Sequence, residues 1–290
     1  HLVFTLPHAL NGLIGAAPRR LYENLFAAAS ATLIEFAASP RHLGGMPAFS
    51  LVLHTWKQDL GRHVHVHALV AGGALSDTGE WISPKKGFLF PVRALSKVFR
   101  GKFVAGLDHL RQQRQLPEAL DQAAWQTLKH TLHAHDWVVY AKQPLGGPQA
   151  VLDYLGRYTH RVAISNERII GIAHDHVAFR VRGDSEGKKR VLRLAGSEFI
   201  ARFLLHVLPS GFKRIRHYGL LSPARKKVGL AAARSALAVP PPEPAIIESV
   251  TAFLHRVARL ASMGCPHCGG QFQVTATLLP QRGATARGPP

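Results

Sequence analysis

The sequence is that of a globular and strongly basic chain. It has 290 residues, 47% of them hydrophobic and 18% charged, so apolar burial can offset the entropy of ordering and disorder of the whole chain is excluded. Lys and Arg number 36 against 17 Asp and Glu, which gives a formal net charge of +19, most of it after Tyr140. A polyanion is therefore the expected partner.

Three features bear on compartment and processing. The longest apolar stretch, from Leu25 to Ala38, contains Ser30 and Glu35 and is too short to span a bilayer, so no membrane is expected among the partners. Cys265 and Cys268 cannot form a disulfide framework, which fits a reducing cytoplasm. The first residues lack Met and a signal-peptide pattern, so we expect residues upstream to be missing.

Local patterns predict interleaved strands and helices. Alternating, β-branched and aromatic content predicts strands at residues 2–6, 49–55, 63–72, 137–142, 168–172, 176–181 and 190–194. Apolar residues at helical spacing predict helices at 20–38, 93–110, 147–160 and 197–207, the third opened by Gly147-Pro148. Because hairpin-length links join them, the expected fold is α+β, with a mostly antiparallel central sheet flanked by helices.

A Pro-rich stretch divides the chain. Residues 239–244 read Val-Pro-Pro-Pro-Glu-Pro and follow a run of small residues, a composition typical of an extended linker. We therefore expect a catalytic domain at 1–235, a linker at 236–247 and a C-terminal appendage at 248–290.

The most informative segment runs from Gly61 to Val70. On a strand, successive side chains alternate between faces, so His63, His65 and His67 share one face while apolar residues occupy the other. Neutral imidazoles are common ligands of divalent metal ions, so this face is a candidate metal site. The alternative is a solvated strand face in a chain with 18 histidines.

A second segment places two tyrosines on a helix. Tyr154 and Tyr158 are separated by four residues and so lie about 40° apart at the edge of the apolar stripe. Arg157 and Arg161 fall on the other flank, where they could hold a phosphate that the phenols attack. The alternative is that both tyrosines are aromatics at the edge of the core.

Several motifs together are more specific than either segment alone. They are HLVFTLPHAL, HTWKQ, HVHVHALV, YLGRYTHRVAISNERI and HVLPSGFKRIRHYGLL, spread over residues 1–222. They resemble the motifs of the IS91-type two-tyrosine transposases, members of the HUH endonuclease superfamily. That family usually carries an upstream cysteine-rich zinc-binding domain, and it tends to have Pro and Gly where this chain has Val64 and Lys57.

The resemblance implies a fold, a reaction and partners. It implies an HUH-type domain that nicks and rejoins single-stranded DNA, at transposon ends and target, through a 5′-phosphotyrosine. Tyr154 or Tyr158 would be the nucleophile, and a divalent metal on His65 and His67 would act on the phosphate. The alternatives are a replication initiator or relaxase with the same chemistry, and a nucleic-acid-binding fragment without catalysis.

The third metal ligand has four candidates, His54, Gln58, Asp59 and His160. We favour Gln58, with His54 as second choice, and disfavour His160 because it would point away from both tyrosines. An oxygen ligand beside two imidazoles suits Mg²⁺ or Mn²⁺, whereas three imidazoles favour Zn²⁺.

Two further segments are expected to bind ligands. Cys265-Pro-His-Cys268 is half of a zinc-ribbon pattern, whose Zn²⁺ site would need His267, His255 or another chain. The run from Phe212 to Tyr218 mixes aromatic residues with Lys213, Arg214 and Arg216, and Arg225-Lys-Lys227 follows it. This mixture suits single-stranded DNA, while a solvated basic face is the alternative.

Overall fold

The computed structural model describes residues 1–85, 89–117, 120–159, 163–182 and 189–242, together with a few residues between 248 and 270. The chain divides into two compact units, His1–Pro240 and Pro241–Pro290, and the boundary lies in the Pro-rich stretch. The domain limits at 235 and 247 remain predictions. All elements below belong to the first unit.

The main sheet has six strands among the described residues. They are β1 (Leu2–Thr5), β2 (Met46–Trp56), β3 (Arg62–Leu75), β4 (Trp81–Ile82), β5 (Val139–Ala141) and β9 (Ile215–Gly219). The order is β5-β1-β3-β2-β9, with β4 paired to β3, and every pairing is antiparallel. The predicted α+β class with a mostly antiparallel sheet is confirmed. The long strand β3 lies inside the sheet.

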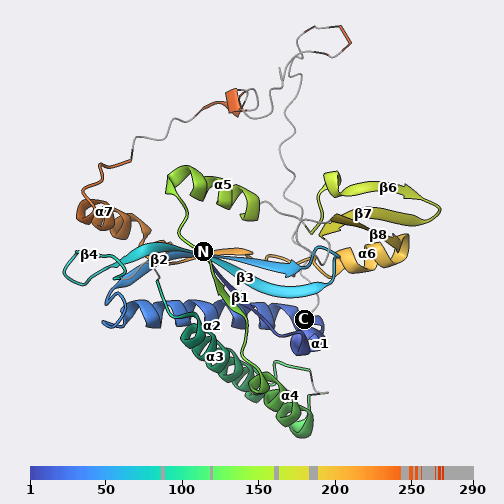
Figure 1. Cartoon of the computed structure of the whole chain (residues 1–290), viewed down its shortest axis with the longest axis horizontal. Helices are drawn as coiled ribbons and strands as arrows, with labels where there is room; N and C mark the ends of the chain where they lie inside the picture. The colour runs from blue at the N-terminus through green and yellow to red at the C-terminus, as the bar shows by residue number, and fades with distance from the viewer. Residues whose placement is uncertain are drawn as a thin grey trace, which may run out of the picture. The chain divides into compact units, whose positions relative to one another are not determined.

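Helices cover one face of this sheet. A 3₁₀ turn (His8–Leu10) and α1 (Asn11–Ala16) lead into α2 (Pro18–Ala38); α3 (Val92–Gln112) and α4 (Gln122–Ala134) follow β4. α2 and α3 run beneath the strands (Figure 1). Their apolar stripes pack against Phe4, Leu51, Val64 and Val66, which are almost fully buried. The residues between these on β1, β2 and β3 therefore point to the opposite face.

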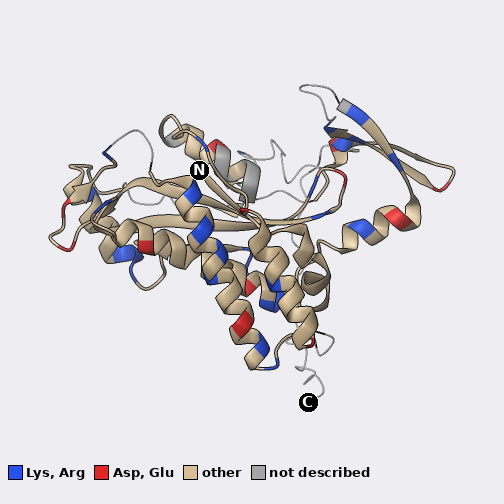
Figure 2. Cartoon of the chain, turned by 60° about the horizontal axis from the view of Figure 1, so that its bottom comes forward, with Lys and Arg blue, Asp and Glu red and all other residues tan. Residues whose placement is uncertain are grey.

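The opposite side of the sheet carries α5 (Gly147–Thr159) (Figures 1 and 2). Gly147 has a φ of +88°, a conformation that glycine tolerates, just before Pro148 in the first helical turn. The predicted tyrosine helix is thus present. It lies on the side of the sheet to which the histidines of β3 point.

A smaller sheet follows α5. It has three antiparallel strands in the order β6 (Ile169–Ala173), β7 (His176–Arg182) and β8 (Lys189–Ala195), with a 3₁₀ turn (Asn166–Arg168) before it and α6 (Gly196–Leu204) after it. Its inner face forms a separate core around Phe179, which includes Leu60 from the turn between β2 and β3. The smaller sheet is therefore anchored at that turn. Strand β9 then returns to the main sheet, and α7 (Lys226–Ala236) ends the unit.

None of the helices among the described residues is both long enough and apolar enough to cross a membrane.

Candidate functional site

Three imidazoles converge on the face of the main sheet that α2 and α3 leave open. They belong to His54 on β2 and to His65 and His67 on β3, and their candidate ligand atoms all lie within 4.8 Å of one another. His54 and His67 are buried and His65 is half-buried. Among the described residues, no other group of three His, Cys, Asp or Glu is this close.

Strand geometry brings the three residues together. His65 and His67 are two residues apart on β3, so they share a face, while Val64 and Val66 on the other face are buried in the core. His54 is the direct cross-strand partner of His65. Partners opposite one another in an antiparallel ladder point to the same side, so the register alone places the third imidazole beside the pair.

Hydrogen bonds orient the two rings on β3. His65 Nδ1 lies 3.0 Å from the carbonyl oxygen of His63, to which its N–H donates, and His67 Nδ1 lies 2.9 Å from Nε2 of His1. The rings of His1 and His67 are also stacked, with centroids 5.1 Å apart. With both Nδ1 atoms engaged, the Nε2 atoms of His65 and His67 face one another at 3.1 Å. Outer partners of this kind set the tautomer of a metal-binding histidine.

The site keeps His65 in the form that binds metals. Burial, followed by the repulsion of His54, lowers the pKa of His65 from 6.5 to about 3. At neutral pH this imidazole is therefore uncharged, and its Nε2 lone pair is directed at the neighbouring nitrogens. A divalent cation would bind these ring nitrogens in place of the hydrogen bond between His65 and His67. The donor set fits a borderline transition-metal ion.

The expectation that Gln58 is the third ligand is not supported. Gln58 lies in the turn between β2 and β3, and its side-chain oxygen accepts a hydrogen bond of 2.8 Å from the backbone N–H of Arg182. Its backbone oxygen accepts from the guanidinium of Arg168. Gln58 therefore fastens the smaller sheet to the turn, and His54, our second choice, completes the group. Asp59 accepts from Gly61 N at 2.9 Å within the same turn.

The predicted nucleophiles lie on α5. Tyr154 and Tyr158 both fall within this helix, but their side chains, and that of Arg157, are outside the described set. Residues 160–162, and with them His160 and Arg161, also lie outside the described residues. The roles of these residues therefore remain predictions. What the fold establishes is that the tyrosine helix and the three imidazoles lie on the same side of the sheet (Figure 1).

Arg216 does not share the face on which the histidines lie, and its contact with DNA stays a prediction. On β9, Arg216 pairs with Leu51, a core residue, so it points towards α2. Its guanidinium carbon lies 4.4 Å from the ring centre of Phe26 and 5.0 Å from that of Phe212. Sequence alone could not distinguish this internal cation–π contact from a surface contact, because both use Arg beside aromatic residues.

The neighbours of Arg216 differ from it. Lys213 is exposed. Arg214 is half-buried and lines a small cavity of about 140 Å³, together with Trp56 of β2, Phe203 of α6, His206 and neighbouring residues. Burial lowers the pKa of Arg214. Of the three cations predicted in this run, only Lys213 thus stands fully in solvent.

Cys265 and Cys268 belong to the second unit. Both are free thiols, and hydrogen bonds from the backbone of His267 and Cys268 lower the pKa of Cys265. They form no three-ligand group with the described His267, and His255 lies outside the described residues. Zinc at these cysteines remains a prediction.

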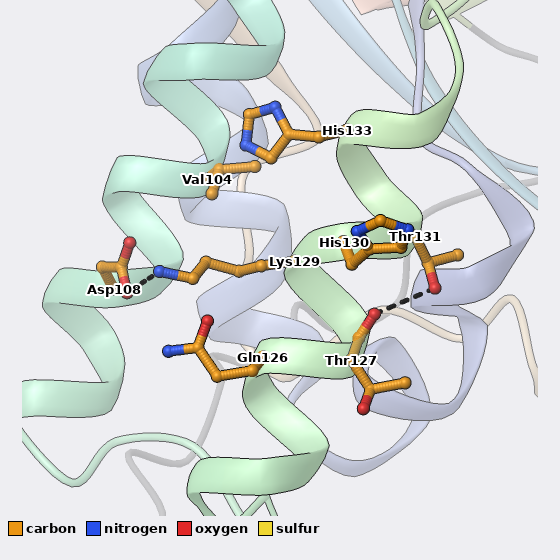
Figure 3. A pocket seen from close by; sticks show the side chains of 8 residues that line it. All are labelled: Val104, Asp108, Gln126, Thr127, Lys129, His130, Thr131 and His133. Atoms are coloured by element: carbon orange, nitrogen blue, oxygen red, sulfur yellow. Dashed lines mark hydrogen bonds and ion pairs between the residues drawn. The ribbon is translucent and has the colours of Figure 1, made fainter.

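A cavity away from the histidines lies between α3 and α4 (Figure 3). It is an open groove of about 830 Å³, and its single carboxylate, Asp108, lies 3.6 Å from Lys129 Nζ and accepts from Trp125 Nε1 at 2.9 Å. Asp108 and Lys129 neutralise one another, and the groove lies on the helical side of the sheet, opposite the histidine cluster. We therefore do not assign the groove as the reactive site.

Comparison with known proteins agrees with the sequence motifs. The transposase family Y2_Tnp, described as "Putative transposase", matches residues 48–228. "Putative transposase y4qJ" of Sinorhizobium fredii (strain NBRC 101917 / NGR234) is 40% identical over 290 residues, covering 96% of this chain and 73% of that protein. The transposase for insertion sequence element IS801 of Pseudomonas savastanoi pv. phaseolicola is 28% identical over 77% of this chain and 54% of that protein. This chain thus spans about half the length of the IS801 transposase.

A conjugative relaxase, TrwC, solved in complex with mutant OriT DNA, is similar over 54% of this chain and 71% of its own, with 16% identity and a TM-score of 0.28. That likeness is too slight to bear on the site. The family match covers more than half of the chain and includes His54, His65, His67 and the tyrosine helix. The chain therefore belongs to the Y2_Tnp transposase family, in agreement with its resemblance to the IS91-type two-tyrosine transposases.

Proposed function

We propose that this chain cuts and rejoins single-stranded DNA through a phosphotyrosine intermediate, with a divalent metal held by His54, His65 and His67. The observation that carries the proposal is the convergence of three imidazoles on an open sheet face that also bears the tyrosine helix. Membership of a transposase family supplies the substrate class, DNA. The polarity of the intermediate, a 5′-phosphotyrosine, is implied by resemblance to HUH endonucleases.

The chemistry requires few groups. The phenol oxygen of Tyr154 or Tyr158 attacks the phosphorus of the DNA backbone, and the bond from phosphorus to the 3′ oxygen breaks. The phenol loses its proton, and the departing 3′ oxygen takes one up. The new ester keeps the phosphodiester energy, so a 3′ hydroxyl can later reverse the step and release the tyrosine. When bound, the metal ion would neutralise charge on the non-bridging oxygens of the phosphate.

The residues of this chain would divide the remaining work. His54, His65 and His67 would hold the cation, and His1 and the His63 carbonyl would keep the rings turned towards it. Arg157 and Arg161 would pair with the phosphate from the helix side. Phenol has an ordinary pKa near 10, so these positive charges would also favour the phenolate as it forms.

Two nucleophiles allow two strands to be held at once. Tyr154 and Tyr158 are one helical turn apart on α5, about 6 Å along its axis. Both phenols could therefore attack the same metal-bound phosphate site only if the helix or the DNA shifts between the two reactions. This spacing suits a sequence of two transfers, one for the donor strand and one for the target strand.

The ligand set also favours particular metals. Three imidazoles without an oxygen ligand favour Zn²⁺ over Mg²⁺, which prefers oxygen donors. Because His54 replaces Gln58 in the cluster, the preferred ion shifts from Mg²⁺ or Mn²⁺ to Zn²⁺, with Mn²⁺ as the alternative.

A denaturing gel tests the reaction directly. Labelled single-stranded DNA carrying a transposon end is incubated with the protein and Mn²⁺, and a covalent adduct is expected to persist in denaturant. EDTA and the double variant Tyr154→Phe/Tyr158→Phe should both abolish the adduct. Tyr140→Phe is the matched control, because Tyr140 is an exposed tyrosine on β5 of the same sheet. An adduct that survives in the double variant would refute the assignment, and DNA binding without any adduct would leave the non-catalytic alternative.

A further inference from the structure

The smaller sheet presents an unusually basic outer face. Its three strands carry five Lys and Arg and no Asp or Glu. Figure 2 shows Lys and Arg recurring along these strands. The inner face is lined on β7 by the buried Val177, Phe179 and Val181, and Arg190, the cross-strand partner of Val181, lies on this side. The alternate residues of β7 therefore face outwards, and Arg180 and Arg182 are among them.

Strand register gathers three arginines on this outer face. Arg193 on β8 pairs with Ala178 on β7, and Ala178 is two residues before Arg180. Arg193 and Arg180 are therefore diagonal neighbours on the same face of the two strands. Arg182 follows two residues later on the same face. All three side chains are exposed, and among the described residues no carboxylate lies within ion-pair distance of any of them.

We infer that this outer face, defined by Arg180, Arg182 and Arg193, binds the phosphate backbone of duplex DNA beside the strand that is cut. Same-face residues on a strand are about 6.6 Å apart, and one strand of B-DNA presents a phosphate about every 3.4 Å of axis. Because the DNA strand also winds around that axis, successive phosphates lie farther apart through space than this rise, and neighbouring arginines come close to the spacing of successive phosphates. A rigid strand pair holds guanidinium groups at this spacing without ordering a loop.

The side chains on this outer face favour binding of duplex over single-stranded DNA. Proteins that hold single strands stack bases on aromatic rings. The outward-facing residues of the described β7 and β8 include no Phe, Tyr or Trp; Phe179 is buried on the inner face. A flat, basic β-ribbon without Phe, Tyr or Trp on its outer face suits a duplex, whose grooves and regular phosphates require no unstacked bases.

Hydrogen bonds attach the smaller sheet, which carries this outer face, to the turn between the two strands that bear the histidines. Arg182 N donates to Gln58 in the turn between β2 and β3, and Arg202 of α6 donates to the backbone oxygen of Asp59 at 3.2 Å. Gln58 is only four residues beyond His54, about 13 Å along an extended chain. A duplex on the outer face would thus lie next to a single strand at the histidine cluster. In this respect the inference rests on the proposed function.

The test measures binding separately from cleavage. The triple variant Arg180→Gln/Arg182→Gln/Arg193→Gln is compared with the wild type, in EDTA, for binding to a duplex and to a single strand of equal length. Arg41→Gln/Arg93→Gln/Lys97→Gln is the matched control, since it removes the same charge from exposed positions outside this sheet. We expect duplex affinity to fall at least tenfold at moderate salt in the first variant only. The slope of log K against log salt should lose up to about 2.7, because three phosphate contacts are removed.

Two further measurements distinguish a loss of DNA contacts from misfolding, and a failure of this inference from a failure of the proposed function. A third variant, Arg180→Lys/Arg182→Lys/Arg193→Lys, keeps the charges and should retain most of the duplex affinity. Adduct formation with a short single strand should stay within about twofold in all variants. The inference is overturned if the Gln variant binds duplex normally, if single-strand affinity falls equally, or if the control loses as much. The wild type could form no adduct while the triple Gln variant still loses duplex binding. In that case the proposed function is refuted, but the assignment of the outer face as a duplex-binding surface is supported.

Discussion

His54 on β2 and His65 on β3 are direct cross-strand partners, and their rings lie 5.5 Å apart. The ring of His54 is closer still to that of His67, with centroids at 4.5 Å. One residue of the neighbouring strand thus touches both histidines of the motif. The third candidate ligand is fixed by the sheet itself and not by the turn in which Gln58 lies.

This relationship predicts different outcomes for two alanine variants. His54→Ala should weaken Mn²⁺ or Co²⁺ binding by at least tenfold, since it removes one of three imidazole ligands. Gln58→Ala should leave metal affinity within about twofold, because the Gln58 side chain bonds to Arg182 N. Metal titration of both folded proteins decides the point. Equal metal affinities in the two variants would contradict the assignment of His54.

A second prediction concerns the partner of His67. His1 should act as a positioning residue, because its Nε2 lies 2.9 Å from His67 Nδ1. His1→Phe keeps an aromatic ring to stack on His67 but removes the nitrogen that pairs with its Nδ1, so we expect metal affinity to fall by about tenfold. His1→Gln retains a polar group and should lose less. DNA affinity in EDTA serves as the control and should not change in either variant.

Arg216 provides a test of stability against binding. Its contacts with Phe26 and Phe212 predict that Arg216→Ala lowers the free energy of unfolding by about 1–2 kcal/mol. Its affinity for single-stranded DNA should remain within about twofold. Lys213→Ala, at an exposed neighbouring position, should leave stability unchanged. Urea unfolding and a filter-binding assay measure the two quantities, and a large loss of DNA affinity with normal stability would reverse our interpretation.

The tyrosines should not be interchangeable in a complete transposition cycle. Tyr154→Phe and Tyr158→Phe each remove one phenol oxygen and keep the ring, so the fold should survive. Each single variant should still form some adduct with an isolated single strand, whereas both should fail in transposition. Mass spectrometry of the DNA-linked peptide identifies the attacking residue. An adduct on Tyr140 or Tyr218 would exclude α5 as the source of the nucleophile.

His206 makes stability sensitive to acid. Its Nε2–H donates to the carbonyl of Leu60 at 3.0 Å, and its Nδ1 lies 3.2 Å from the hydroxyl oxygen of Thr55. Burial lowers the pKa of His206 below 6.5. The unfolded chain therefore takes up a proton first as the pH falls, so stability is lost below about pH 6.5.

The acid sensitivity is checked by unfolding between pH 7.5 and 5.5. The wild type should lose stability more steeply than His206→Gln, which cannot be protonated in this range. His176→Gln replaces an exposed histidine of the smaller sheet and is the control; its slope should match that of the wild type. Parallel slopes for the wild type and His206→Gln would show that another group titrates.

Local patterns were sufficient for much of the fold. The predicted strands at 49–55 and 63–72 correspond to β2 and β3, and the helix at 93–110 corresponds to α3, because each has a strong apolar period. The helix α4 and the strand β9 were missed. β9 mixes Arg and His with few apolar residues, and its strand character comes from pairing with β2, far away in sequence.

The site was predictable to a similar degree. Alternation alone put His65 and His67 on one face, whereas the choice between His54 and Gln58 required the register of β2 against β3. His54 carries a signal in hindsight, since it lies on the predicted strand at 49–55 while Gln58 lies beyond its end. The outward arginines of β7 and β8 could not be separated from other basic residues without knowing which face of the small sheet is buried.

The inner position of β3 has a consequence for how the metal site forms. A slip of β3 by one residue against β1 and β2 would drive its histidines into the apolar layer beneath and expose Val64 and Val66. Correct alignment of the core and assembly of the imidazole cluster are therefore one event. A free metal concentration of a hundred times the dissociation constant would stabilise the native alignment by about 2.7 kcal/mol. A cation bound here would therefore also disfavour the slipped register of β3.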